Sequence, residues 1–121
     1  MQATTDAACL CKMADRGQIA QALLDGPLAL DLAISLEAVQ NKGLTSPVAG
    51  DADILLVPDI NAGNMVAKQL TFLGRADAAG IVLGARVPII LTSRSDSLRA
   101  RLMSCALAVR MAQARRIGQV K

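Results

Sequence analysis

Short apolar runs alternate along this chain with longer stretches in which apolar residues recur at helical spacing. Four of the short runs predict strands, at residues 19–24, 54–57, 79–83 and 87–91. The run at 54–57 shows no polar alternation, which is typical of a strand buried on both faces. The turn residues Asp25-Gly26-Pro27 follow the first run, and Gly84 closes the third.

The longer stretches predict helices at residues 4–15, 28–39, 65–73 and about 96–116, with a stop at 41–43 after the second and at Gly74 after the third. In the last of these, one apolar stripe is expected to pack inward, made of Leu98, Leu102, Cys105, Val109 and Ala112. The predicted order is α-β-α-β-α-β-β-α. We therefore expect an α/β fold with three layers and a mainly parallel sheet.

Composition narrows the chemistry that such a fold can perform. The chain has no histidine, one aromatic residue (Phe72) and three cysteines, Cys9, Cys11 and Cys105. No histidine-based triad or base is available, no metal site is expected, and aromatic stacking platforms for nucleic acid are excluded. The cysteines are expected to be reduced, with Cys105 in the core. Because no apolar run reaches the roughly 18 residues of a membrane span, we expect a cytoplasmic protein without membrane contact.

The net charge of +3 is unevenly distributed. Residues 94–121 hold seven basic side chains against Asp96 alone, a balance of +6, whereas residues 1–93 hold six basic and nine acidic side chains, a balance of −3. A basic tail of this kind can meet phosphate, nucleic acid or an acidic surface, or simply form the solvated face of a helix. Arg94 is not expected to belong to this solvated helix face, because it lies in a polar loop.

Two polar loops follow predicted strands. The first, residues 58–64, offers the carboxylate of Asp59, the amides of Asn61 and Asn64, and Gly63, which permits close approach of the backbone. Asp25 follows another predicted strand and can face the same edge, or serve only as a turn residue. Asn61 has the alternative of a plain helix N-cap. Ligands of open α/β sheets bind at the carboxyl ends of the strands, so this loop is a candidate binding segment.

The second loop, residues 93–97, reads Ser-Arg-Ser-Asp-Ser. The planar guanidinium of Arg94 binds two phosphate oxygens at once and keeps its charge, while the hydroxyl of Ser93 is a hydrogen-bond donor. Asp96 has three candidate roles: it can hold Arg94, cap the next helix, or take a proton. We expect the two loops to face one anionic ligand.

These segments resemble the phosphate acetyltransferase and phosphate butyryltransferase family, above all the butyryltransferase-like branch that is also fused to enoyl-CoA hydratase modules. The matching stretches are DGPLALDLAIS (25–35), SPVAGDADILLVPDINAGN (46–64) and AAGIVLGARVPIILTSRSDS (78–97). Residues 1–121 are similar to the C-terminal portion of such a protein, and the resemblance implies that the N-terminal half of the family is absent from this chain.

The resemblance implies a fold like that of isocitrate and isopropylmalate dehydrogenases, with a cleft between two domains. It also implies reversible acyl transfer between coenzyme A, as substrate, and inorganic phosphate, in a homodimer with no tightly bound cofactor. Ser93, Arg94 and Asp96 match the catalytic segment, and Asp25, Asp59, Asn61, Gly63 and Asn64 the substrate-binding segments. Ala100 stands where the acetyltransferase branch has an aspartate. The alternative is a non-catalytic oligomerisation or ligand-binding module. The basic tail alone would suit a nucleic-acid binder, but no nucleic-acid partner is expected.

Overall fold

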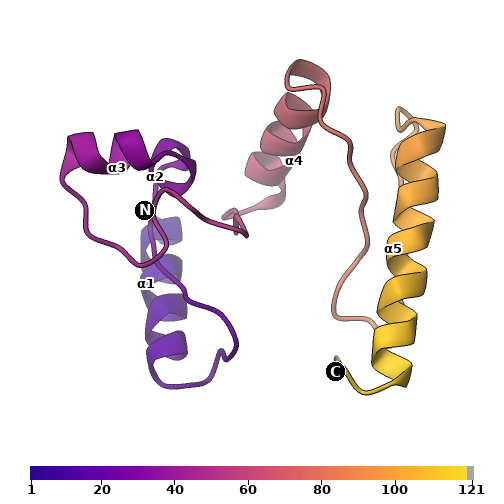
Figure 1. Ribbon diagram of the computed structural model, residues 1–121, viewed down its shortest axis with the longest axis horizontal. Coiled ribbons are helices and arrows are strands. Elements are labelled where there is room, and N and C mark those ends of the chain that lie inside the picture. The colour runs from indigo at the N-terminus through magenta and orange to yellow at the C-terminus, as the bar shows by residue number, and fades with distance from the viewer. Residues whose placement is uncertain (120–121) are drawn as a thin grey trace. The chain divides into compact units, whose positions relative to one another are not determined.

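The computed structural model describes residues 1–119, which form two compact units, Met1–Ala62 and a second that begins at Gly63. The chain is helical apart from its connecting segments (Figure 1). The helices are α1 (Gln2–Asp15), α2 (Leu30–Ile34), α3 (Leu36–Lys42), α4 (Ile60–Lys68), the π-helical segment η1 (Gln69–Leu73) and α5 (Leu98–Arg116). The four predicted helical stretches are therefore helical, with corrections at their ends and one break.

The break is at Ser35, where a single helix over 28–39 was predicted. Ser35 has extended backbone (φ −129°, ψ 111°), and its hydroxyl accepts a hydrogen bond from the amide of Ala38 at 3.3 Å. A serine hydroxyl competes with the helical backbone for amide hydrogens, so it ends α2 and caps α3. Gly43 then ends α3 in the left-handed conformation, close to the predicted stop at 41–43.

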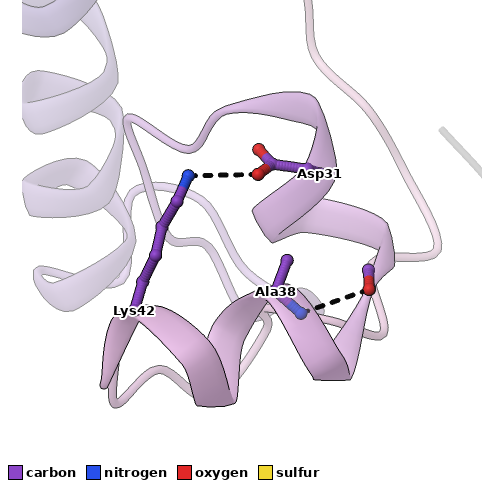
Figure 2. A network of polar contacts seen from close by, with 4 residues as sticks. Asp31, Ala38 and Lys42 are labelled. Atoms are coloured by element: carbon purple, nitrogen blue, oxygen red, sulfur yellow. Dashed lines mark hydrogen bonds and ion pairs between the residues drawn. The ribbon is translucent and has the colours of Figure 1, made fainter.

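An ion pair between Asp31 on α2 and Lys42 on α3 links the two helices across this break (Figure 2). The Nζ atom of Lys42 lies 3.0 Å from Oδ2 of Asp31, and both side chains are about half exposed. Donation from Lys42 is the main cause that lowers the pKa of Asp31 below its ordinary value. The ion pair thus acts as a surface clamp on the α2–α3 corner.

The loop after α3 packs back on the same corner. The amide of Gly50 donates to the carbonyl of Leu32 at 2.7 Å, and that of Ala52 donates to Ala33 at 3.1 Å. Gly50 has a φ of +85°, and a Cβ atom there would lie 2.6 Å from Cδ2 of Leu36. Only glycine meets both conditions, because it tolerates positive φ and adds no side chain.

In the second unit, α4 continues into η1, and Gly74 caps the end as predicted. The Gly74 amide donates to the carbonyl of Gln69 at 2.9 Å, the five-residue spacing of a π-helix. Such single π turns inside helices are frequent at functional sites. The predicted start at residue 65 was too late, since α4 already begins at Ile60.

Helix α5 begins at Leu98, two residues after the predicted start, and Ser97 is its N-cap, with its hydroxyl accepting from the Ala100 amide at 3.1 Å. Its buried residues are Ser104 and Ala108. The predicted inward stripe was wrong: Leu98 is 73% exposed, and Cys105 is an exposed free thiol rather than a core residue. Polar contacts with the segment at 80–85 determine which face packs, and apolar periodicity alone does not reveal them.

Within residues 1–119 no strand is formed, and Val82 and Ile89 share an isolated antiparallel bridge, with the Val82 amide 2.8 Å from the Ile89 carbonyl. The predicted strand at 54–57 is exposed, with Ile54 at 81% and Leu56 at 76%. Buried apolar side chains of the described residues are three alanines, Ala33, Ala49 and Ala108. The mainly parallel sheet therefore stays a prediction.

Candidate functional site

Ser93 and Asp96 close a tight turn immediately before α5. The amide of Asp96 donates to the carbonyl of Ser93 at 3.1 Å, and Oδ2 of Asp96 accepts from the amide of Ser93 at 2.7 Å. This reciprocal pair fixes the backbone on both sides of Arg94. A residue at the tip of such a pinned turn loses less conformational freedom when it binds a ligand, which favours affinity.

Two serine hydroxyls converge inside the same turn. The Oγ atoms of Ser93 and Ser95 lie 3.0 Å apart and share a hydrogen bond, and the Ser95 amide lies 3.3 Å from Oγ of Ser93. Ser93, Arg94 and Ser95 are all exposed, while Asp96 is half-buried. The turn therefore presents a guanidinium and two hydroxyls to solvent from one short segment.

The first turns of α5 carry further arginines, and two of them have local partners. The Nη2 atom of Arg101 lies 3.4 Å from the carbonyl oxygen of Arg94, and Nη2 of Arg99 pairs with Asp77 at 2.8 Å. Farther along, Nη1 of Arg115 donates to the carbonyl of Ala85 at 2.9 Å. The basic tail is thus partly engaged in structure, whereas no ion pair of Arg94 occurs within residues 1–119.

Beside this turn lies a pocket of about 280 Å³ within the second unit. It is lined by residues of α4, η1, the 76–78 segment and the start of α5: Ala67, Lys68, Thr71, Phe72, Ala76, Asp77, Ala78, Ser95, Asp96, Ser97 and Ala100. Lys68 is not among the candidate site residues predicted from the sequence. The structure adds it, because Lys68 is half-buried in this pocket, and it shows that Ser97 caps α5.

The first candidate loop is the start of a helix. The Oδ1 atom of Asp59 accepts a hydrogen bond from the Ala62 amide at 2.9 Å. Asp59, and not Asn61, is therefore the residue that caps α4. Asn61, Gly63 and Asn64 all lie within α4. Asp59 and Asn61 belong to the first unit, and Gly63 and Asn64 to the second. The expectation that this segment and the Ser93–Asp96 turn face one ligand stays a prediction.

Asp25 lies in the first unit as an exposed turn residue. Its Oδ1 accepts from the amide of Gly26 at 2.8 Å, and Sγ of Cys11 lies 3.8 Å from the Gly26 carbonyl. This geometry is the ordinary one of a turn carboxylate. A role for Asp25 in substrate binding stays a prediction.

Two features are absent from the described part of the chain. Residues 1–119 contain no group of three or more cysteine or carboxylate side chains that are arranged to hold a metal ion. Nor does any helix in this range combine the length and apolarity needed to cross a bilayer.

Comparisons with known proteins identify the family of the chain. Residues 1–109 match the family described as "Phosphate acetyl/butaryl transferase". The chain therefore belongs to the phosphate acetyl/butyryl transferase family, which confirms the resemblance drawn from the sequence.

Individual relatives agree with this assignment. A phosphate acetyltransferase of Rhizobium meliloti is 65% identical over 97% of this chain and 37% of the relative. A phosphate butyryltransferase of Clostridium beijerinckii is 52% identical over 93% of this chain and 37% of the relative. The crystal structure of a branched-chain phosphotransacylase from Enterococcus faecalis V583 superposes with a TM-score of 0.78 at 43% identity, covering 91% of this chain and 39% of that one. The chain thus spans between a third and two fifths of the length of these relatives.

Proposed function

We propose that this chain carries the phosphoryl-binding part of a phosphate acyltransferase, which moves an acetyl or butyryl group between coenzyme A and inorganic phosphate. The observation that carries the proposal is the pinned turn of Ser93 and Asp96, which holds Arg94 exposed at its tip. The names of the relatives, transferases acting with phosphate, support the reaction class.

In the proposed reaction, the thiolate of coenzyme A attacks the carbonyl carbon of an acyl phosphate. A carbon–sulfur bond forms, the carbon–oxygen bond to phosphate breaks, and inorganic phosphate leaves with the electron pair. Negative charge grows on the leaving phosphoryl oxygens, and a guanidinium stabilises charge of this kind through paired N–H donors. Arg94 has this role, and the Ser93 hydroxyl donates a hydrogen bond to the same group.

Asp96 acts in this proposal as a positioning residue. Its Oδ2 is already engaged by the Ser93 amide at 2.7 Å, so it is placed to fix the turn rather than to receive a proton from the thiol. A free thiol has a pKa near 8.5, about one and a half units above neutral pH, so ionisation costs only about 2 kcal/mol. A dedicated base is therefore not essential to the reaction.

The remaining features follow from the same proposal. Coenzyme A is a substrate and no tightly bound cofactor takes part. The protein works in the cytoplasm, as a homodimer.

The side chains of Ile54 and Leu56 are apolar and exposed, which supports their burial by another polypeptide surface. We propose that residues 54–57 then form a strand of a mainly parallel, three-layer α/β sheet.

The second candidate function is a non-catalytic oligomerisation or ligand-binding module. The buried apolar core of three alanines and the exposure of Ile54 and Leu56 favour it for the chain by itself. A transition state requires groups held in place from several sides, and one turn supplies only a part of them.

The test is the release of free thiol from acetyl-CoA and butyryl-CoA by the purified chain, with and without phosphate. Phosphate-dependent release is expected, and Arg94→Ala should lower its kcat/KM about a hundredfold, in the range found when one charge-stabilising donor is removed. Arg110→Ala, which changes an exposed arginine of α5, is the matched control. Release that is absent in the native chain, with self-association by light scattering, would favour the module instead.

A further inference from the structure

Lys68 differs from Lys12 and Lys42 because it forms no ion pair within residues 1–119. It is the last residue of α4, at the junction with the π-helical segment η1, and it is half-buried. Its Nζ atom lies 5.3 Å from the centroid of the Phe72 ring and 3.4 Å from Oγ of Ser95. The stem therefore follows the pocket wall, and the ammonium group points at the turn that carries Arg94.

The charge of Lys68 has no carboxylate partner among residues 1–119. The ion pairs in that range are Lys12 with Asp15, Lys42 with Asp31, and Arg99 with Asp77. Both carboxylates that line the pocket have other partners, since Asp77 pairs with Arg99 and Asp96 accepts from the Ser93 amide. A partly desolvated ammonium that no carboxylate contacts attracts an anion.

The hydroxyls extend this positive site toward Ser93. Ser95 Oγ lies 3.4 Å from the ammonium of Lys68, and Ser93 Oγ lies a further 3.0 Å from Ser95 Oγ, so an ammonium and two hydroxyls follow one another from the pocket to the turn. The N-terminus of α5 contributes little to this positive site, because the hydroxyl of Ser97 already accepts a hydrogen bond from the Ala100 amide. The pocket of about 280 Å³ is far larger than the roughly 15 Å³ that a single water requires, which leaves room for a phosphoryl group.

We infer that Lys68 is a phosphoryl-binding residue, which together with Ser95 and Ser93 extends the site from the Ser93–Asp96 turn into the pocket beside it. A lysine suits this position because its compact ammonium serves as a point charge, while the planar fork of arginine gives direction. This inference rests on the proposed function for the identity of the ligand, and it adds a binding residue from a separate helix.

The experiment measures binding of inorganic phosphate to the intact chain by calorimetry or by ³¹P NMR, independently of any acyl transfer. Lys68→Met should raise the dissociation constant for phosphate at least tenfold, and Lys68→Arg, which keeps the charge, should restore binding to within a few fold. Lys12→Met is the matched control, because Lys12 is an exposed lysine on α1 paired with Asp15. Circular dichroism at 222 nm checks that each variant remains folded.

A second arm identifies which phosphoryl group is bound, by titrating coenzyme A and 3′,5′-ADP into the same variants. Weaker binding of phosphate in Lys68→Met places the inorganic phosphate at Lys68, whereas weaker binding of coenzyme A and 3′,5′-ADP alone places a phosphate of the nucleotide there. Either result supports the inference, even when the chain shows no acyl transfer and the proposed function fails. Affinity for all three ligands that is unchanged in Lys68→Met, or undetectable in the native chain, would overturn it.

Discussion

The hydroxyl of Ser104, on α5, accepts a hydrogen bond from the Gly80 amide at 3.0 Å and donates one to the Ala100 carbonyl at 2.8 Å. Ser104 is 3% exposed, which makes it the most buried polar side chain of the described residues. The bond ties the segment before the Val82–Ile89 bridge to the helix that follows the Ser93–Asp96 turn. It is therefore a structural anchor for the candidate site.

Ser104→Ala should lower the free energy of unfolding by about 0.5–1.5 kcal/mol, because the Gly80 amide loses its partner. Urea denaturation measures the change. Thr5→Ala, an exposed position on α1, serves as the control and should shift stability by less than about 0.5 kcal/mol. Equal midpoints for the native chain and Ser104→Ala would show that the contact adds nothing to stability.

Asp96 can be tested as a positioning residue against its alternative as a proton acceptor. Asp96→Asn keeps an oxygen that can accept from the Ser93 amide, so we expect KM for phosphate to change little. Asp96→Ala removes the acceptor and should raise that KM about tenfold, the effect of losing a hydrogen bond to a charged group. A large fall in kcat for Asp96→Asn, with a lost limb in the pH profile, would instead identify Asp96 as a base.

Acid should weaken the α2–α3 corner through Asp31. The carboxylate is favoured in the folded chain because Lys42 donates to it, so its pKa lies below the ordinary 3.8. A lowered pKa stabilises the fold above 3.8, and this contribution disappears as the pH falls through the folded value. At pH 7 the native chain should therefore have a slightly higher urea midpoint than Asp31→Asn, and the two midpoints should coincide near pH 2. The difference at pH 7 should be smaller in high salt, because both charged groups are half exposed. A difference that persists at pH 2 would contradict this account.

Helix positions in this chain can be predicted from sequence, because capping residues and glycines define them locally. Gly43 and Gly74 end helices where the sequence indicates a stop, and the Ser93–Asp96 turn lies where the polar pattern placed it. The break at Ser35 was missed because the apolar residues Leu32 and Leu36 keep helical spacing across it. Only the competition of the Ser35 hydroxyl for the Ala38 amide separates α2 from α3.

Tertiary contacts account for the other differences. Helical periodicity predicted that Cys105 is buried, but the hydrogen bond between Ser104 and Gly80 turns the neighbouring face inward. Lys68 could not be assigned to the site from spacing, since 27 residues separate it from Ser95 in sequence. An unpaired lysine at the end of a helix carries no local pattern that distinguishes a ligand-binding position from a solvated one.

Phe72 is the single aromatic residue of the chain, which has no tryptophan or tyrosine, and its ring lies beside the ammonium of Lys68. The protein is consequently almost transparent at 280 nm and has no tryptophan fluorescence. Because no other residue emits in the tryptophan range, the fluorescence of a tryptophan placed at Phe72 would come from that position alone. Its emission would report on the charge of the neighbouring pocket.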